Sequence, residues 1–216
     1  MNVKRSILTG IVFVLVVVGC TNTSKDINEF NKPAMYWYKK IGESISQNKM
    51  DRADAYYISL RSEHMRSPLM PTAMMMLAHA HMDNEKYILS TYYLDEFNKR
   101  YRASNNREYT DYMKLQAAFL GIRDVYKDQK LIIDSIDKAN TYVARYPDSD
   151  YSPLVNTMLI RLRMSQYLLN ENIAALYDRT GKKNAAKIYR EKNVGSTLGM
   201  GDIIAPIKGF MSKVFD

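Results

Sequence analysis

The sequence predicts an all-α fold, a solenoid of about four stacked helix pairs. Breakers are scarce, with 9 Gly and 6 Pro in 216 residues, whereas long side chains such as Met (14) and Tyr (17) are abundant. Apolar residues recur at helical spacing in segments that short polar turns separate. The segments follow one another as pairs at a period of roughly 34–45 residues, which is typical of repeats that bury their faces by stacking.

The N-terminal segment has the pattern of a signal peptide. Lys4 and Arg5 precede an almost wholly apolar run, ILTGIVFVLVVV, over residues 7–18. As a helix this run would span about 18–20 Å, less than the ~30 Å hydrocarbon core of a bilayer. We therefore expect residues 1–19 to be a cleaved signal peptide and not a spanning helix.

Cys20, the single cysteine, follows this run directly and has no partner in the chain for a disulfide. Val17-Val18-Gly19-Cys20 resembles the bacterial lipobox, and the alternative is a buried free thiol. The resemblance implies that Cys20 becomes the acylated N-terminus of the mature chain, carrying diacylglyceryl and palmitate. Thr21, in place of Asp, implies outer-membrane sorting, facing the periplasm. Residues 20–32 would then be the lipidated cysteine and a flexible tether.

The helical repeat domain is expected over residues 33–193. Turns are predicted at residues 47–49, 83–85 and at Gly181, with a longer insertion near residues 124–130 and a break at Ser67-Pro68 and Pro71. The predicted helix pairs are 34–45 with 50–60, 73–82 with 86–101, 111–122 with 131–147, and 151–179 with 182–192.

Small residues recur where paired helices would approach closely, 11 or 12 positions apart across each turn. They are Gly42 with Ala53, Ala78 with Ser90, and Ala174 with Ala185. This spacing fits the tetratricopeptide (TPR) pattern. In the first pair we expect Tyr38, Ile41 and Ile45 to form the apolar stripe of one helix.

The stretch YPDSDY (residues 146–151), followed by a long helix rich in Leu and Arg and then Gly181, resembles the BamD (ComL) family. Pro147 is expected to end one helix, and Asp148 or Ser149 to cap the next. The resemblance implies an outer-membrane lipoprotein of the β-barrel assembly machinery, a scaffold for the POTRA domains of BamA that helps to recognise and insert unfolded outer-membrane β-barrel clients. One departure is residues 194–216, a Gly-containing tail in place of the family's fifth repeat, with Ile203, Ile207 and Val214 at amphipathic spacing.

Two partner surfaces follow from the resemblance. A client groove would use aromatic side chains in the first two pairs, although tyrosine at helical spacing is more often part of a solenoid core. These residues are Tyr36, Trp37, Tyr38, Tyr56, Tyr92 and Tyr93. A BamA-like partner would meet the basic cluster of the last helix, whose alternative role is a solvated surface. This cluster is Lys182, Lys183, Lys187 and Arg190.

No motif for catalysis or a cofactor occurs in the sequence, so we expect no enzyme activity, no cofactor and no metal. His79 and His81 are two positions apart on a predicted helix, so they point to opposite faces and cannot share a metal ion. The net charge of +8 admits nucleic acid, anionic lipid or an acidic protein. Because the signal peptide predicts export to the periplasm, nucleic acid is disfavoured as a partner. The alternative function is another periplasmic TPR lipoprotein, either a secretin pilotin or a peptidoglycan- or division-associated factor.

Overall fold

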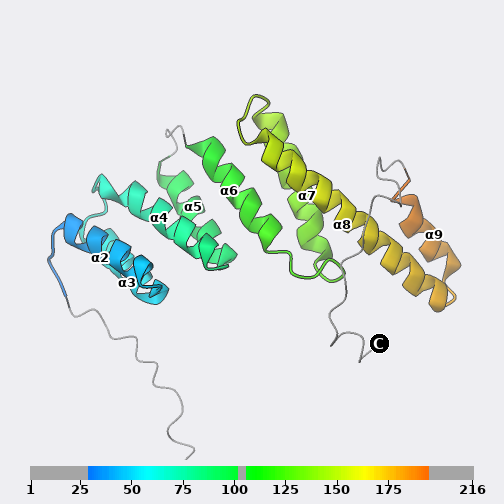
Figure 1. Cartoon of the computed structure of the whole chain (residues 1–216), viewed down its shortest axis with the longest axis horizontal. Coiled ribbons are helices and arrows are strands. Elements are labelled where there is room, and N and C mark those ends of the chain that lie inside the picture. The colour runs from blue at the N-terminus through cyan, green and yellow to red at the C-terminus, as the bar shows by residue number, and fades with distance from the viewer. Residues whose placement is uncertain (1–28, 102–105, 195–216) are drawn as a thin grey trace, which may run out of the picture. The chain divides into compact units, whose positions relative to one another are not determined.

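The computed structural model describes residues 29–101 and 106–194, and each regular element there is a helix (Figure 1). The chain divides into two compact units, residues 1–73 and 74–216, and helix α4 (Leu69–Asp83) contains the division. The predicted signal peptide, Cys20 and residues 195–216 of the predicted tail lie outside the described residues. Among the helices that are described, none is long and apolar enough to cross a membrane.

The first unit is built on α2 (Ala34–Ser46) and α3 (Met50–Glu63), which pack against each other. On α2 the buried stripe is Trp37, Ile41 and Ser44. The predicted stripe was wrong in register, because Tyr38 and Ile45 are only partly buried and Ile41 alone is shared. The indole of Trp37 has the largest apolar surface on this helix, so its burial determines which face of α2 packs against α3. On α3, Ala53, Tyr57 and Leu60 are all buried.

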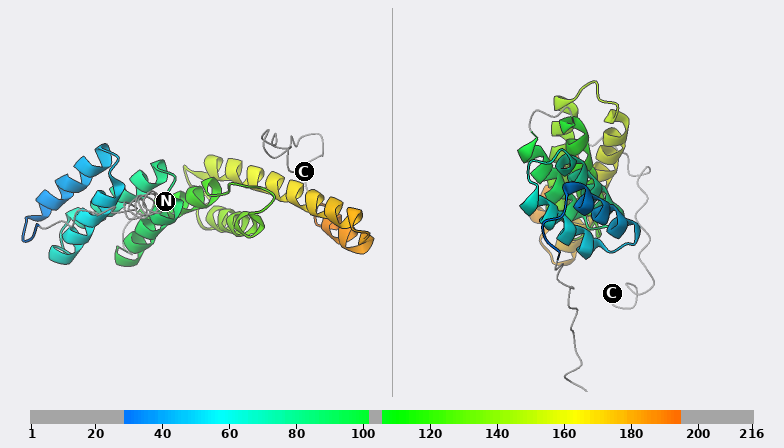
Figure 2. Two further views of the ribbon diagram at one scale, coloured as in Figure 1. Left: turned by 90° about the horizontal axis from the view of Figure 1, so that it is seen from below. Right: turned by 90° about the vertical axis from the view of Figure 1, so that its left-hand side faces the viewer.

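The second unit contains the rest of α4 and the helices α5 (Tyr87–Arg100), α6 (Arg107–Leu120), α7 (Gln129–Arg145), α8 (Ser152–Arg179) and α9 (Lys183–Glu191). From α5 onward each helix packs against the next, and α6 also contacts α8. With 28 residues, α8 is long enough for two partners, α7 and α9. The view in Figure 2 shows α9 beside the C-terminal part of α8.

The three predicted tight turns are confirmed, and each places one residue in the left-handed region. These residues are Asn48 (φ 55°), Glu85 (φ 57°) and Gly181 (φ 75°), each two positions before the next helix. The predicted break at Pro71 was wrong, since α4 begins at Leu69 and holds Pro71 in its first turn. A proline is tolerated there because first-turn N–H groups have no partner within the helix.

In two of the pairs, small buried residues recur at a spacing of 12 positions across the turn. Ala78 with Ser90, and Ala174 with Ala186, are fully buried. The prediction of Ala185 was wrong by one residue, because Ala185 is only partly buried. A shift of one position turns a side chain by about 100° on a helix, so only Ala186 faces α8. In the first pair the buried residue 12 positions before Ala53 is Ile41, and Gly42 is partly exposed.

Candidate functional site

Four of the predicted client-groove aromatics belong to the first unit, and they differ in burial. Trp37 is fully buried and Tyr56 is 5% exposed, whereas Tyr36 and Tyr38 are partly exposed. The Trp37 ring contacts the rings of Tyr36 and Tyr56, with centroids 5.3 and 6.0 Å apart. Trp37 and Tyr56 therefore pack the interior of the α2–α3 pair, and Tyr36 and Tyr38 are the aromatic side chains of this set that an added peptide can contact.

The Glu63 carboxylate, at the end of α3, holds the chain that leads into α2. It accepts hydrogen bonds from Trp37 Nε1 (2.8 Å) and from the backbone N–H groups of Asn31 (3.1 Å) and Lys32 (3.3 Å). The hydrogen bond from Trp37, followed by the two backbone donors, lowers the pKa of Glu63. The last residues of the predicted tether are thus fixed against the α2–α3 pair.

The other two predicted aromatics, Tyr92 and Tyr93, lie on α5 in the second unit. The Tyr93 ring is buried and stacks on His81 of α4 at a centroid distance of 5.5 Å. Tyr92 is 44% exposed and touches Tyr93 edge to face. His79 is exposed while His81 is buried, so the two histidines do point to opposite faces of α4. Tyr92 is consequently the aromatic side chain that this part of α5 offers to a partner.

The predicted basic cluster lies at the start of α9 and along it, and part of its charge is paired within the chain. Arg190 forms an ion pair with Asp178 of α8, and this hydrogen bond raises the pKa of Arg190. Lys187 pairs with Glu191 at 3.7 Å, and the ammonium of Lys182 lies 6.0 Å from the centre of the Tyr177 ring. All four side chains are exposed. Arg190 therefore joins α8 to α9 as well as facing solvent.

The YPDSDY step connects α7 to α8 and binds back onto α6. Ser149 Oγ donates to a carboxylate oxygen of Glu108 and accepts from Tyr142 Oη (2.8 Å) and from the Tyr151 N–H (3.1 Å). The predicted cap was wrong, because neither Asp148 nor Ser149 caps α8, whose N-cap residue is Tyr151 without a side-chain hydrogen bond. The hydroxyl of Ser149 instead uses its one donor and both acceptor positions at the junction of three helices.

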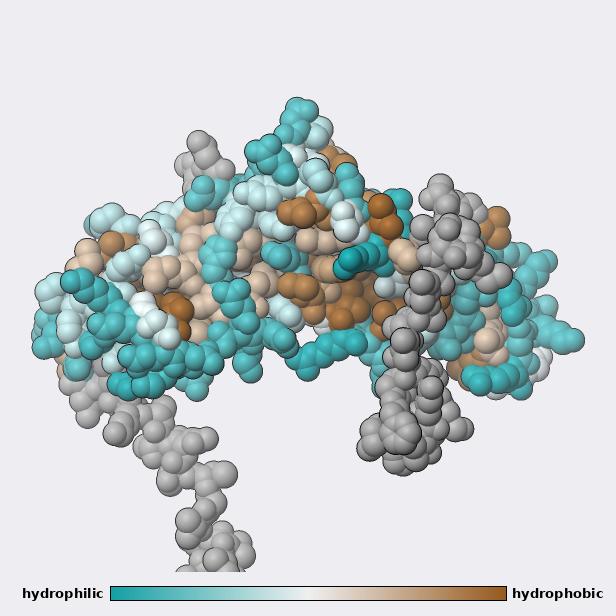
Figure 3. Space-filling view, in the orientation of Figure 1, coloured by the Kyte–Doolittle hydropathy of each residue, from teal (hydrophilic) through white to brown (hydrophobic). Residues whose placement is uncertain are grey.

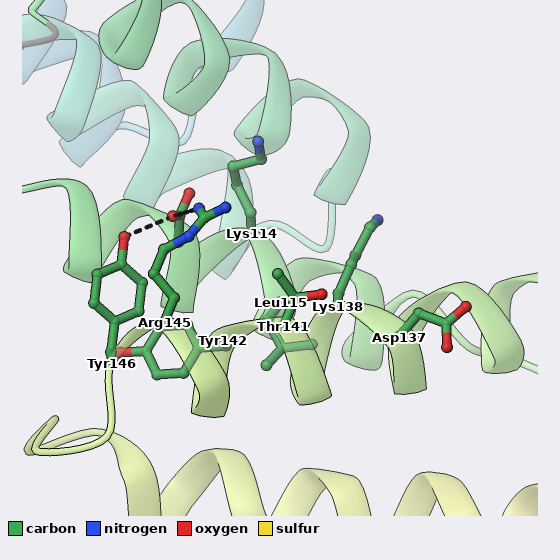
Figure 4. A pocket seen from close by; sticks show the side chains of 9 residues that line it. Lys114, Leu115, Asp137, Lys138, Thr141, Tyr142, Arg145 and Tyr146 are labelled. Carbon is green, nitrogen blue, oxygen red and sulfur yellow. Dashed lines mark hydrogen bonds and ion pairs between the residues drawn. The ribbon is translucent and has the colours of Figure 1, made fainter.

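A polar hollow of about 280 Å³ lies beside this step, between α6 and α7. The side chains of Arg145 and Tyr146 point toward one carboxylate (Figure 4), that of Asp111, with donor–acceptor distances of 3.1 and 2.9 Å. Burial, and then the hydrogen bond to Asp111, raise the pKa of Tyr146. Asp111 thus ties the end of α7 to α6.

A larger groove of about 830 Å³, which the sequence pattern does not predict, lies between α5, α6 and α7. Its lining is mostly apolar, and Ile88 and Leu89 of α5 are 87% and 41% exposed. The signal in the sequence is that these two residues fall outside the buried stripe of Ser90, Tyr93 and Leu94. We call this feature the α5–α7 groove. The face drawn in Figure 3 also exposes apolar residues over α6–α8.

Comparison with known proteins shows the family of this chain. The model of a family described as outer membrane lipoprotein (YfiO) matches residues 30–197, which include all eight described helices. The chain belongs to the YfiO (BamD) family. It is also 36% identical over 189 residues to the outer membrane protein assembly factor BamD of Helicobacter pylori, with 88% of this chain and 86% of that protein covered. The family resemblance drawn from the YPDSDY step and the repeats is confirmed.

Proposed function

We propose that the chain is a lipid-anchored assembly factor of the outer membrane, a non-catalytic scaffold in the machinery that inserts β-barrels. The observation that carries the proposal is the identity of 36% to an outer membrane protein assembly factor across nearly the full length of both chains. Stacked helix pairs suit a scaffold, because such arrays present long surfaces to several partners at once. The signal peptide and Cys20 would supply the address and the anchor, with the helices facing the periplasm.

Within this function we assign the basic cluster to a BamA-like partner. Lys182, Lys183 and Lys187 are exposed cations at the start of one short helix and along it, and an acidic patch on a POTRA domain would complement them. Arg190 is the member whose role is divided, since it also pairs with Asp178. We assign client contact to the accessible rings of Tyr36, Tyr38 and Tyr92, because a half-exposed tyrosine offers a large apolar face and a hydroxyl together.

Capture of the intact protein from detergent-solubilised membranes tests the function. A BamA-like barrel protein should be recovered with the chain. Recovery of a secretin, or of peptidoglycan-bound division proteins, without a barrel assembly partner would contradict the proposal and support the alternative scaffold. Lys182→Glu and Lys183→Glu should each reduce the capture, whereas Lys99→Glu on α5 is a charge-matched change away from the cluster.

A charge swap separates the two roles of Arg190. Arg190→Asp alone should weaken capture in either case, since it removes the α8–α9 ion pair and one cation of the surface. Arg190→Asp combined with Asp178→Arg restores an ion pair between the helices. Recovered capture in the double variant would show that Arg190 acts through the α8–α9 pair, and continued loss would show that it contacts the partner.

A further inference from the structure

The α5–α7 groove exposes apolar surface that no other part of its own unit covers in the described chain. Ile88 is 87% exposed although the same helix buries Leu94 completely. A scattered exposed apolar residue is ordinary, but here Ile88 and Leu89 line a concave surface together with Leu131 of α7. Concave apolar surface beside a charged rim is a common form of a site for a peptide.

The floor of the groove is made of small residues of α6 and its end, Ala117, Ala118 and Gly121. A Cβ added at Gly121 would lie 3.1 Å from the carbonyl oxygen of Ala117 and 3.6 Å from the ring of Tyr87. A larger side chain at Gly121 would therefore crowd the floor. Because these residues have small side chains or none, a helix bound in the groove can approach the backbone of α6 closely.

The rim of the groove is cationic. Lys86, Arg123 and Lys138 line it, and none of them forms an ion pair with another described residue. Lys114, also on the rim, pairs with Asp95 of α5 at 2.5 Å, and Glu85 is the acidic residue of the lining. The balance of charge therefore favours a ligand with carboxylates beside its apolar side chains.

The groove continues into the polar hollow, because Lys114 and Lys138 line both. The hollow adds Asp111, Asp137 and Arg145 to the lining, and Asp111 is already paired with Arg145, so cations remain in excess over the combined surface. Figure 4 shows both lysines extending away from the ring of Tyr142. Along α7 the combined lining runs from Leu131 to Arg145, and the 14 helical steps between these residues cover about 21 Å. That length accommodates about four turns of a second helix lying along the groove.

We propose that the α5–α7 groove binds an amphipathic, acidic helix of a partner protein. Its apolar side chains lie on Ile88, Leu89 and Leu131, and its flanking carboxylates meet Lys86 and Lys138. A basic or neutral amphipathic helix would match the apolar lining but would not complement the cationic rim. This surface shares no residue with the basic cluster of α9 or with the exposed tyrosines, so the inference goes beyond the proposed function.

The first test uses a synthetic peptide of about 14 residues with Leu at helical spacing on one face and Glu on the flanks. Fluorescence anisotropy measures its binding to the whole chain in detergent, beside the same peptide with Gln for Glu. We expect the Glu peptide to bind about tenfold more tightly than the Gln peptide, with an advantage that shrinks as salt rises. Equal binding of the two peptides would overturn the proposal.

Variants then locate the binding. Ile88→Asp and Lys138→Glu should each weaken the binding of the Glu peptide by about tenfold. Ile160→Asp on α8, where the isoleucine is 53% exposed, and Lys99→Glu on α5 are matched changes outside the groove and should leave binding unaltered. Circular dichroism checks that each variant is folded. Binding that is insensitive to both groove variants would overturn the proposal.

A photo-crosslinking residue at Leu89 identifies the occupant. An adduct with the Glu peptide supports the proposal. An adduct that maps to residues 195–216 of the same chain, or to a second copy, would overturn it, and so would binding of phosphatidylglycerol vesicles in the absence of any peptide binding. None of these results depends on capture of a barrel assembly partner, so failure here and failure of the proposed function remain distinguishable.

Discussion

Single polar side chains close the junctions between helices in this protein. Glu63 joins residues 31 and 32 and the indole of Trp37 to the end of α3, and Ser149 joins α6, α7 and the start of α8. Partly buried donors and acceptors of this kind are costly to leave unpaired, more so than their net contribution when paired. Mutations at these residues should therefore affect stability more than their size suggests.

Glu63 makes the stability of the first unit depend on pH. Its pKa is lowered in the folded state, chiefly by the hydrogen bond from Trp37, so its contribution is fully present above the unfolded pKa near 4.5. That contribution is lost as pH falls through the lower, folded value. Urea unfolding at pH 7 and at about pH 4 should show a steeper loss for the wild type than for Glu63→Gln. Parallel pH profiles would contradict this assignment.

Ser149→Ala should destabilise the second unit by about 1–3 kcal/mol, because it leaves Glu108, Tyr142 and the Tyr151 N–H without their shared partner. The midpoint of urea unfolding measures the change. Ser165→Ala is a matched control, since Ser165 Oγ bonds only to the Arg161 carbonyl on an exposed part of α8. A control that loses as much stability as Ser149→Ala would refute the special role of the junction.

At the scale of the elements, the tight turns and the close helix contacts define each pair. Asn48, Glu85 and Gly181 occupy equivalent left-handed positions, and the three residue types tolerate that backbone differently. Glycine has no Cβ to strain, asparagine is tolerated, and glutamate is disfavoured. The α4–α5 turn is thus the strained one of the three.

Glu85→Gly should raise the free energy of unfolding by up to about 1 kcal/mol, and Asn48→Gly by less. Gly181→Ala should lower it by about 1 kcal/mol, and steric contact cannot contribute, because nothing lies within 4 Å of the added Cβ. Thermal unfolding of the three variants gives the ranking. A stabilised Gly181→Ala would contradict the left-handed assignment.

Ala186→Leu should destabilise the α8–α9 pair by about 1–3 kcal/mol, because Ala186 is fully buried where α9 packs on α8. Ala185→Leu, one position away and partly exposed, should have a much smaller effect. Chemical unfolding followed by circular dichroism measures both. Equal effects would place the contact face between the two residues and contradict the register described above.

For the molecule as a whole, the proposed function requires that the helical domain be attached to the membrane. The family match begins at residue 30, near the end of residues 20–32, the segment that we expect to carry the lipid and form the tether. The expected anchor and the scaffold are therefore separate in sequence. Changing the anchor should leave the fold intact.

Cys20→Ser should leave the chain folded and without lipid. Radiolabelled palmitate should be incorporated into the wild type and not into the variant, while the far-ultraviolet circular dichroism of the two purified proteins should agree. Incorporation of palmitate by the variant would refute the lipid attachment at Cys20. Loss of helicity would instead mean that Cys20 contributes to folding.

Local patterns account for most of what could be predicted. Helical spacing and turn residues depend on neighbours in sequence, so the eight helices of the described residues and the turns at Asn48, Glu85 and Gly181 followed from the sequence. The YPDSDY step indicated the family for the same reason, since its residues are contiguous. The role of Ser149 could not be predicted, because its partners Glu108 and Tyr142 are brought to it by the packing of α6 and α7.

Rotation of each helix about its axis is set by packing. The sequence pattern predicted Tyr38 and Ala185 on the contact faces, whereas Trp37 and Ala186 are the residues that are buried there. The α5–α7 groove likewise depends on three helices meeting, and no single segment contains it. Sequence periodicity thus gives the elements and their order, whereas exposure of a given side chain depends on neighbours far away in the chain, which only the packed helices supply.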